Sequence, residues 1–533
     1  MMGNKKLQVW LPLIFSVVMI VGMFLGYGLG SKSGNSKGFF SSNKRGSVQE
    51  VLDLIKMRYV DNVQVDSLEG KAIQEMMNEL DPHSVYFPPV DVQEANEDLA
   101  GNFEGIGVEF NVFSDTVNVV YVIPGGPSDK AGLIIGDKIV SVNDSSLTRK
   151  KFSTDEIKKL IRGERGSKAI LKIVRNNQLQ TVAVTRGTIP VPSLDAAYML
   201  NKETGYIKLN KFTETSYEEF MKALEDLKGL GMKSLILDLR GNGGGFMNEA
   251  VDMADEFLDG DKLIVYTEGA NNKKKEYRCK RPGLFEKGDL VVLVDELSAS
   301  ASEVLAGALQ DWCRAKIIGR RTFGKGLVQE QYPLSDGAAI RLTVARYYTP
   351  LGRSIQRSYE KGKKVYMDEL WERFSSGEML SADSLKNHNN GKQFLSVCKD
   401  TLYGGDGITP NIFVPFDTSR SLQRTFRYIN NSKFSSFVYN YYLEHRQQID
   451  QLKSPDNFIA KFSHNEDLWT GLLKYTADDT INYPSATSKE KELLELRLKA
   501  LLARYMWRNS GFYQVLNSDD PVVNKALEVI NKK

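Results

Sequence analysis

The chain has 533 residues, of which 41% are hydrophobic and 26% are charged. This length exceeds what a single hydrophobic core supports, and the composition excludes both a disordered chain and a multi-span membrane protein. Seventy basic and 67 acidic residues leave a net charge of +3, so we expect several folded units and no nucleic-acid partner.

The N-terminal 30 residues predict one transmembrane helix. Lys5 and Lys6 precede an apolar stretch from Val9 to Leu29, which is about the twenty residues needed to cross the hydrocarbon of a bilayer. We expect residues 1–30 to be an uncleaved anchor; a cleaved signal peptide is the alternative. Positive charge before the span stays cytoplasmic. We therefore expect a single-pass inner-membrane protein whose folded body lies in the periplasm of a Gram-negative cell.

Two segments follow the expected anchor. Residues 31–46 are rich in Ser, Gly, Lys and Asn, which is typical of a flexible tether. Residues 47–100 carry apolar residues at helical spacing, and Asp81-Pro82 ends the second of the expected helices. This part is therefore predicted to be a helical segment.

From residue 101 to 187 the pattern changes to short strands separated by glycine turns. A proline-glycine turn at residues 124–127 leads into a short helix. Ser153 and Glu156 have the spacing of a capping box, which predicts the start of a second helix. The segment is therefore expected to be a small β-rich module.

This module resembles a PDZ domain in Gly105-Ile106-Gly107-Val108 and in the stretch from Gly126 to Asn143. A glycine loop that opens a strand presents backbone N–H groups to a carboxylate, while the strand edge pairs with the last residues of a peptide. The alternative for the loop alone is a plain β-turn. With both stretches present, we expect the module to bind unfolded or flexible protein C-termini.

Residues 188–356 alternate between strands and helices, which predicts an α/β core. Ser234 to Leu239 and Val291 to Val294 are continuous apolar runs suited to buried strands. A glycine-rich turn at residues 240–245 ends the first run, and a helix is expected from Ser298 to Trp312.

The last third of the chain is less regular. Residues 357–403 are polar and predict an irregular insertion, after which residues 404–416 return to the core. Residues 417–533 are predicted to be helical, and Thr487 with Glu490 has the spacing of a capping box. These helices could cap the core, form a homo-oligomer or hold an adaptor protein.

The cysteines give little information on their own. Cys279, Cys313 and Cys398 are odd in number and far apart, so neither a zinc site nor a disulfide framework is indicated, although one bridge remains possible. No metal or other cofactor is expected.

Histidine chemistry is not favoured. His83, His388, His445 and His464 all lie outside the glycine-rich strand ends, and none is in a known nucleophile or metal motif. A Ser/His/Asp triad therefore has little support.

A serine cluster begins the helix after the second buried strand. Ser298-Ala-Ser-Ala-Ser-Glu303 places hydroxyl groups at a helix N-terminus, where the potential is positive. Ser300 with Glu303 also fits a capping box, so the alternative is that Ser300 only caps the helix.

Lys325 is the candidate base. The segment from Gly319 to Gly326 is similar to a phosphate loop, but Gly326 lacks the hydroxyl that binds magnesium. On a strand from Phe323 to Gln329, Lys325 and Gln329 would face the same way, so the amide could orient the amine. To act near pH 7, the lysine pKa must fall by about three units, which requires burial or a nearby positive charge.

Three motifs in order resemble those of the carboxyl-terminal processing (tail-specific) peptidases. They are Ser298-Ala-Ser-Ala-Ser-Glu303, Thr322-Phe-Gly-Lys-Gly-Leu-Val-Gln329 and Ala345-Arg-Tyr-Tyr-Thr-Pro350. The resemblance implies that Ser300 is the nucleophile of a Ser/Lys dyad, that Lys325 is its base and that Gln329 orients the lysine.

The same resemblance implies oxyanion donors from the backbone of Ala301 and of Gly243 or Gly244, without deciding between the two glycines. Asp311 matches an aspartate implicated in some members, but eleven helical residues place it about 16 Å along the axis from Ser300, so we expect a structural role. His83 is assigned no catalytic role.

The predicted fold class is a mixed α+β and α/β multidomain chain, with an N-terminal helical segment, an inserted PDZ module, an α/β protease core and C-terminal helices. The predicted function is a serine endopeptidase of the cell envelope that acts through an acyl-enzyme. The alternative is a catalytically silent PDZ adaptor or scaffold.

Overall fold

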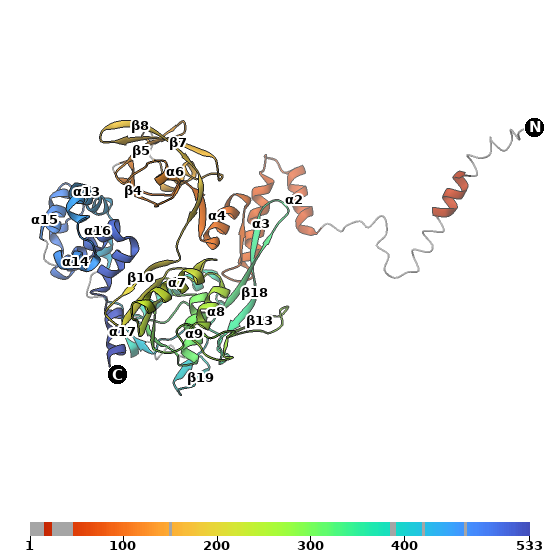
Figure 1. Cartoon of the computed structure of the whole chain (residues 1–533). Helices are drawn as coiled ribbons and strands as arrows, with labels where there is room; N and C mark the ends of the chain where they lie inside the picture. Colours follow the sequence, from red (N-terminus) through yellow and green to blue (C-terminus); the bar gives the residue numbers. More distant parts are fainter. Residues whose placement is uncertain are drawn as a thin grey trace, which may run out of the picture. The chain divides into compact units, whose positions relative to one another are not determined.

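The computed structural model describes residues 15–23, 46–113, 115–148, 152–383, 391–417, 422–462 and 466–532 (Figure 1). The chain divides into two compact units, Met1–Ile73 and Gln74–Lys533. Among the described residues, no helix is long and apolar enough to cross a membrane. Residues 15–23 are helical, while residues 9–14 and 24–29 of the expected span lie outside the described residues, as do residues 31–45 of the expected tether.

The segment before the PDZ module is mostly helical, as predicted, and it also supplies one strand. The helices are α2 (Ser47–Arg58), α3 (Val65–Asn78) and α4 (Pro89–Ala100). The strand β1 (Val85–Phe87) pairs antiparallel with β18 (Ala339–Tyr348). Before β1, the Asp81 carboxylate accepts the N–H groups of His83 and Ser84 at 2.8 Å, which fixes the turn into the strand.

The PDZ module has a five-stranded order β3-β4-β5-β7-β8, with β6 on β5, and β3 lies at the edge. The predicted capping box of Ser153 and Glu156 begins α6. Two further strands, β2 and β9, pair antiparallel where the chain enters and leaves the module. The bounds are β2 (Asn102–Gly105), β3 (Val108–Phe113), β4 (Thr116–Val122), α5 (Pro127–Lys130), β5 (Lys138–Val142), β6 (Ser145–Ser146), α6 (Thr154–Ile161), β7 (Lys168–Arg175), β8 (Gln178–Thr185) and β9 (Gly187–Pro190).

The core is a six-stranded sheet in the order β10-β11-β12-β15-β16-β21. The β10 strand is antiparallel to β11, and the other pairs are parallel. The pairing of β21 with β16 agrees with a core that is interrupted by an insertion. The bounds are β10 (Leu194–Met199), β11 (Thr204–Leu209), β12 (Ser234–Asp238), β15 (Asp289–Val294), β16 (Lys316–Gly319) and β21 (Ile412–Phe413).

Helices cover both faces of the core sheet. Along β12, Leu235 and Leu237 face one core cluster and Ile236 faces another, because successive strand residues point to opposite faces. The first face is covered by α7 (Ser216–Gly229), α8 (Met247–Asp255) and α9 (Ala301–Asp311). This two-sided burial explains the continuous apolar runs in the sequence.

Parallel pairing brings three loops to one edge of the sheet. The glycine-rich turn at residues 240–245 follows β12, Ser300 follows β15, and residues 320–326 follow β16. Because β12, β15 and β16 are neighbours and run parallel, their carboxyl ends meet at that edge.

A second sheet has the order β1-β18-β13-β14, with β17 also on β18. The added strands are β13 (Leu263–Glu268), β14 (Lys275–Arg278) and β17 (Leu327–Pro333). The strand predicted from Phe323 begins only at Leu327. The reason is that the N–H groups of Gly324 and Lys325 donate to the Glu303 carboxylate instead of to a neighbouring strand.

The insertion at residues 357–403 contains a helix that the sequence analysis does not predict. It holds α10 (Lys363–Ser375) and the strand pair β19 (Gln393–Leu395) and β20 (Thr401–Tyr403). The buried residues of α10 are Tyr366 and Arg373. Because these side chains are buried through polar contacts, no apolar stripe marks the helix. A disulfide joins Cys398 of this insertion to Cys313, which follows α9.

The C-terminal helices comprise α12 (Leu422–Ile429), α13 (Ser432–Ile449), α14 (Pro455–Lys461), α15 (Glu466–Tyr475), α16 (Ser488–Asn517) and α17 (Pro521–Asn531). Thr487 and Glu490 cap α16 as predicted, and α16 changes direction at Trp507 and Arg508.

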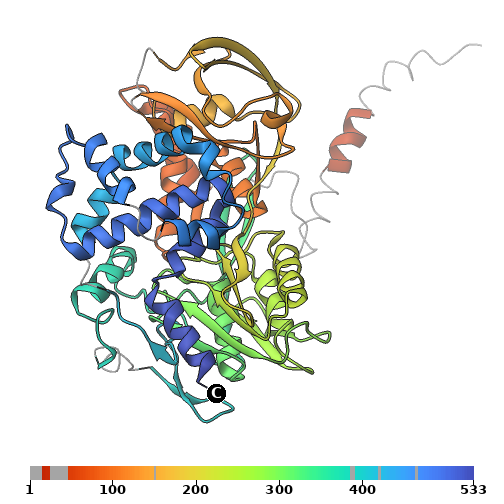
Figure 2. The same cartoon turned by 60° about the vertical axis from the view of Figure 1, so that its left-hand side comes forward.

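The last helix belongs with the core. Helix α17 ends at the C-terminus marked in Figure 2. Its residues Val522, Val523 and Ala526 pack on the face of the core sheet that includes Ile236. The described part of residues 417–533 is mostly helical, as predicted, and α17 buries its apolar face on the core sheet. Of the three roles left open for the C-terminal helices, capping the core is the one that α17 fulfils.

Candidate active site

The three neighbouring serines have different surroundings. The Ser298 hydroxyl is buried and donates to the Leu239 carbonyl oxygen at 2.9 Å. The Ser302 hydroxyl is also buried and donates to the Asn242 carbonyl oxygen at 2.9 Å. Ser300 is half-buried and lines a cavity. Only Ser300 of the three can therefore present its hydroxyl to a substrate.

Ser300 has a strained backbone, with φ of 56° and ψ of −115°. This left-handed conformation is rare for residues other than glycine and is found at sharp strand-to-helix turns that expose a nucleophile. Ser300 and Glu303 form a capping box at the start of α9, and the Glu303 N–H also donates to the Ser300 carbonyl oxygen at 2.8 Å. Ser300 therefore combines the contacts of a helix cap with a strained turn that lines the cavity.

Glu303 joins the nucleophile turn to the loop that carries the base. Its side chain is fully buried and accepts the N–H groups of Ser300 and Lys325, each at 2.9 Å. It also accepts the Gly324 N–H at 2.8 Å and the Thr322 hydroxyl. Burial raises the pKa of Glu303 to about 7, and these hydrogen bonds oppose the increase.

Lys325 and Gln329 are in contact, as predicted. The Lys325 Nζ donates to the Gln329 Oε1 at 2.8 Å, and the Gln329 Nε2 donates to the His83 carbonyl oxygen at 2.6 Å. The two side chains are in contact although Lys325 lies before the start of β17. The pairing of β17 with β18 is irregular between Val328 and Gln329.

The protonation of Lys325 is shifted towards the neutral amine. Burial is the main cause, and the positive charge of Arg341 acts in the same direction, so that the pKa of Lys325 falls to about 8. At pH 7 about one lysine in ten is then neutral, compared with fewer than one in a thousand at the ordinary pKa.

Tyr347 links the two halves of the site. Its buried hydroxyl lies 2.9 Å from the Ser300 carbonyl oxygen and also contacts the Lys325 carbonyl oxygen. Ser300 and Lys325 share a cavity of about 400 Å³, which is lined by Asp98, Leu99, Asn210, Lys211, Gly243, Gly244, Gly245, Phe246, Met247, Ser300, Ala301, Val304, Lys325, Leu327, Val328, Gln329, Arg341 and Tyr347. A polar centre with apolar walls suits a peptide side chain next to a reacting carbonyl.

The two candidate oxyanion glycines differ. The Gly244 N–H donates to the Asn242 Oδ1 at 2.9 Å, and a Cβ on Gly244 would lie only 2.7 Å from the Ser300 Cβ. Gly243 is exposed to the cavity. Within the described part of the chain, the N–H groups of Gly243 and Ala301 have no hydrogen-bond acceptor.

Other residues considered from the sequence lie elsewhere or act structurally. Asp311 forms a buried ion pair with Arg353 at 2.6 Å and accepts the Leu351 N–H at 2.9 Å, which agrees with the expected structural role. His388 and His464 lie outside the described residues. His83, by contrast, lies beside the site, since its carbonyl oxygen holds Gln329.

The PDZ loop is compact. Ile106 is buried in the PDZ core, and its carbonyl oxygen accepts the Ser128 N–H at 2.9 Å. Gly107 has a φ of 76°, and Val108 begins β3. Gly105 ends β2 and pairs with Gly187. Among the residues that the structure describes, no acceptor is found for the N–H groups of Ile106 and Gly107.

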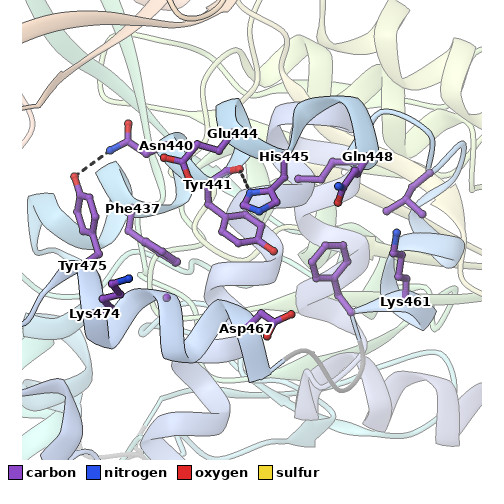
Figure 3. A pocket seen from close by; sticks show the side chains of 14 residues that line it. Phe437, Asn440, Tyr441, Glu444, His445, Gln448, Lys461, Asp467, Lys474 and Tyr475 are labelled. Atoms are coloured by element: carbon purple, nitrogen blue, oxygen red, sulfur yellow. Dashed lines mark hydrogen bonds between the residues drawn. The ribbon is translucent and has the colours of Figure 1, made fainter.

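A larger cavity of about 780 Å³ lies among the C-terminal helices α13, α14 and α15 (Figure 3). His445 stacks there on Tyr441, with 4.1 Å between the ring centroids, and its Nδ1 is 2.9 Å from the Tyr441 carbonyl oxygen. Neither Ser300 nor Lys325 lines this cavity. His445 is therefore not part of the candidate site.

The sequence patterns do not reveal the roles of Glu303, Tyr347 and His83. Glu303 and Tyr347 are within the quoted motifs, so their positions gave a signal, but a capping box and an apolar strand account for them equally well. The contact of His83 with Gln329 spans 246 residues of sequence, and no local pattern reveals it.

The sequence profile of Peptidase family S41 matches residues 203–362, and that of the PDZ domain matches residues 119–175. Residues 425–508 match a family of unknown function (DUF8443). The S41 match includes Ser300, Lys325 and Gln329.

Curated relatives carry matching descriptions. The carboxy-terminal processing protease CtpA of Bacillus subtilis is 33% identical over 371 residues, which cover 69% of this chain and 77% of that protein. A probable CtpA-like serine protease of Staphylococcus epidermidis is 34% identical over 61% of this chain, which spans 65% of that protein's length.

A solved structure of the photosystem II D1 C-terminal processing protease is 30% identical, covers 57% of this chain and 83% of that chain, and has a TM-score of 0.33. The family profile covers the segment that carries Ser300, Lys325 and Gln329. This chain belongs to the carboxy-terminal processing proteases of Peptidase family S41.

Proposed function

We propose that this protein is a serine endopeptidase that cleaves polypeptides with Ser300 as nucleophile and Lys325 as general base. The observation that carries the proposal is the shared cavity, which is lined both by Ser300, the half-buried serine of the cluster, and by Lys325, a lysine whose pKa burial lowers to about 8. Such a lysine is a competent base near neutral pH.

Acylation follows from these positions. Neutral Lys325 accepts the proton of the Ser300 hydroxyl, while the Ser300 oxygen attacks a peptide carbonyl carbon. The N–H groups of Ala301 and Gly243 are the donors we assign to the resulting oxyanion, because the Gly244 N–H is bonded to Asn242. The intermediate collapses when protonated Lys325 returns the proton to the leaving amine nitrogen, which leaves an ester on Ser300.

In deacylation, a water molecule takes the place of the Ser300 hydroxyl as the nucleophile. Lys325 takes a proton from a water molecule, whose oxygen attacks the ester carbonyl, and then returns it to the Ser300 oxygen. Gln329 keeps the amine directed during both steps through its 2.8 Å contact. No step requires a metal ion or a nucleotide.

The substrates we propose are proteins with unfolded or flexible C-termini, captured by the PDZ module. The edge strand β3 can pair with the last residues of a peptide, and the N–H groups of Ile106 and Gly107 can receive its carboxylate. The name of the Bacillus subtilis relative, a carboxy-terminal processing protease, supports this substrate class.

We also propose that the body of the protein lies outside the cytoplasm, tethered to the inner membrane by residues 1–30. The apolar stretch from Val9 to Leu29 and the Cys313–Cys398 disulfide support this location, since stable disulfides are typical of oxidising compartments. We also propose that helices α12 to α16 form a homo-oligomer or hold an adaptor protein.

The experiment is the hydrolysis of fluorescein-labelled casein by the full chain and by the separate variants Ser300→Ala and Lys325→Ala. We expect each variant to lose at least 1,000-fold in rate, as when one member of a catalytic unit is removed. Lys316→Ala, which alters an exposed lysine, should stay within about twofold of wild type. Unchanged hydrolysis by both catalytic variants would instead favour the silent PDZ adaptor.

A further inference from the structure

The orienting residue Gln329 is itself held by a chain of contacts. Its Nε2 donates to the His83 carbonyl oxygen at 2.6 Å, while its Oε1 accepts from Lys325 at 2.8 Å. An amide has distinct donor and acceptor ends, so holding the donor end at His83 fixes which end faces the lysine. The position of the His83 backbone therefore determines where the base is directed.

The His83 ring is held by the inserted helix α10. Its Nε2 lies 2.9 Å from the Tyr366 hydroxyl, and the two rings meet edge to face with centroids 5.3 Å apart. The Gln356 amide donates to the Tyr366 oxygen at 3.4 Å, which leaves the Tyr366 proton for His83. Both residues lie in one aromatic cluster with Phe323, two residues before the base.

Helix α10 also donates hydrogen bonds to the backbone of the loop that carries Lys325. The buried Arg373 guanidinium donates to the Arg321 carbonyl oxygen at 2.6 Å and to the Thr322 carbonyl oxygen at 3.1 Å. The Arg357 guanidinium lies between two rings, 4.1 Å from the Phe323 centroid and 3.8 Å from the Tyr366 centroid. The insertion is therefore packed on the loop by contacts independent of His83.

We propose that His83 and Tyr366 are positioning residues that hold Gln329, and through it the amine of Lys325, in line with Ser300. This inference rests on the proposed Ser/Lys function. Tyr366 lies beyond residue 362, where the match to Peptidase family S41 ends, so the insertion supplies a support for the base from outside the matched segment.

The test compares four variants in the full chain, using a fluorogenic peptide with a free C-terminus as substrate. Tyr366→Phe removes only the hydroxyl, and His83→Leu removes the ring nitrogen that faces it. His83→Gln places an amide where Nε2 was and should rescue the contact. Tyr359→Phe is the matched control, since its ring is next to Tyr366 but its hydroxyl points to Arg346.

We expect Tyr366→Phe and His83→Leu to lower kcat about tenfold with KM within about twofold, because misplaced catalytic groups lose rate rather than binding. His83→Gln should recover most of the loss, and Tyr359→Phe should match wild type. Thermal unfolding midpoints of all four variants separate loss of positioning from loss of folded enzyme.

The pH profile provides the readout that a purely structural role would not change. The charged and titratable groups that face Lys325 are Arg341, Asp81, Glu303 and His83. If Gln329 is released, water reaches the amine and its pKa rises towards the ordinary value, so the acid limb of kcat should move up by roughly half a pH unit.

The outcomes distinguish this inference from the proposed function. If Lys325→Ala is inactive but Tyr366→Phe has the wild-type kcat and pH midpoint, the positioning role is wrong and the dyad stands. If Lys325→Ala is as active as wild type, the dyad itself is wrong. A fall in kcat without any shift of the midpoint, together with a lower unfolding temperature, would assign Tyr366 to stability alone.

Discussion

Lys325 is a half-buried lysine whose surroundings shift its amine towards the neutral form. Burial and the charge of Arg341 lower its pKa, while Asp81 and Glu303 act in the opposite direction. The balance leaves a base whose pKa of about 8 is near the pH at which enzymes usually work. A lysine at its ordinary pKa would be almost entirely protonated and could not accept the serine proton.

The pH dependence of kcat/KM should therefore rise with pH through a midpoint near 8. The sign follows because only the neutral amine can act as a base, and the neutral fraction grows as pH passes the pKa. Arg341→Ala should move the midpoint upward, since it removes a positive charge that favours the neutral form. An activity that is flat or falls between pH 6 and pH 9 would contradict this role of Lys325.

Glu303 holds both catalytic segments by their backbones, which makes it sensitive to a small change. One Glu303 oxygen accepts the N–H groups of Ser300 and Lys325, and the other accepts the Gly324 N–H and the Thr322 hydroxyl. Glu303→Gln turns one of these oxygens into an NH2 group, which cannot accept, so either orientation of the amide leaves one pair of donors without an acceptor. Two buried donors without partners cost about 1 to 3 kcal/mol each. We expect a lower thermal unfolding midpoint and at least tenfold less casein hydrolysis, compared with Glu225→Gln on an exposed surface. Wild-type values for both variants would show that Glu303 is dispensable.

At the scale of elements, the site is produced by parallel strands that end together. The apolar runs of β12 and β15 were predictable because strands buried on both faces need no polar alternation. The capping boxes at Ser153 and Thr487 were predictable because their partners are three residues away. Ser300, Lys325 and Gln329 could be proposed because each lies in a short motif.

The elements that escaped prediction depend on distant partners. The strand β1 exists because β18, more than 250 residues later, pairs with it. Helix α10 is buried through Tyr366 and Arg373, so hydrophobic periodicity does not reveal it. Helix α17 has an apolar stripe, but nothing in its sequence says that the stripe covers the core sheet. Local sequence patterns therefore predict individual helices and strands, whereas long-range packing determines which other elements they contact.

The Cys313–Cys398 disulfide joins the end of α9 to the insertion across 85 residues. In the chain-entropy account, closing a loop of this length stabilises the fold by roughly 4 to 5 kcal/mol. We expect dithiothreitol to lower the thermal unfolding midpoint of wild type but not that of the Cys313→Ser/Cys398→Ser double variant, which should begin lower. Equal midpoints for oxidised wild type and the double variant would show that the bond adds no stability.

At the scale of the whole molecule, the C-terminal helices contact both the PDZ module and the core. Arg504 and Arg508 pair with Glu109 on β3, and the Arg508 guanidinium lies 3.5 Å from the Tyr121 ring centroid. The next residue, Asn509, donates to Asp195 of β10 at 2.6 Å. The change of direction in α16 thus lies between its contacts with the two domains.

Glu109→Gln should loosen the PDZ module from these helices. The side chains of these ion pairs are about one-third exposed, so loss of the pairs should cost only about 1 kcal/mol of stability. The loss weakens the contact between β3 and α16. We expect faster amide hydrogen exchange in β3, β4 and the kink of α16. Glu164→Gln, an exposed PDZ glutamate, is the matched control. Unchanged exchange in both variants would show that Glu109 does not hold the module.

The most direct test of the Ser300–Lys325 account is mass spectrometry of the full chain, quenched with acid during turnover of an activated ester. The account predicts an acyl group on the peptide that contains Ser300 in wild type, and none on that peptide in Ser300→Ala or Lys325→Ala. An acyl group on another residue, or equal labelling of Ser300 when Lys325 is alanine, would contradict it.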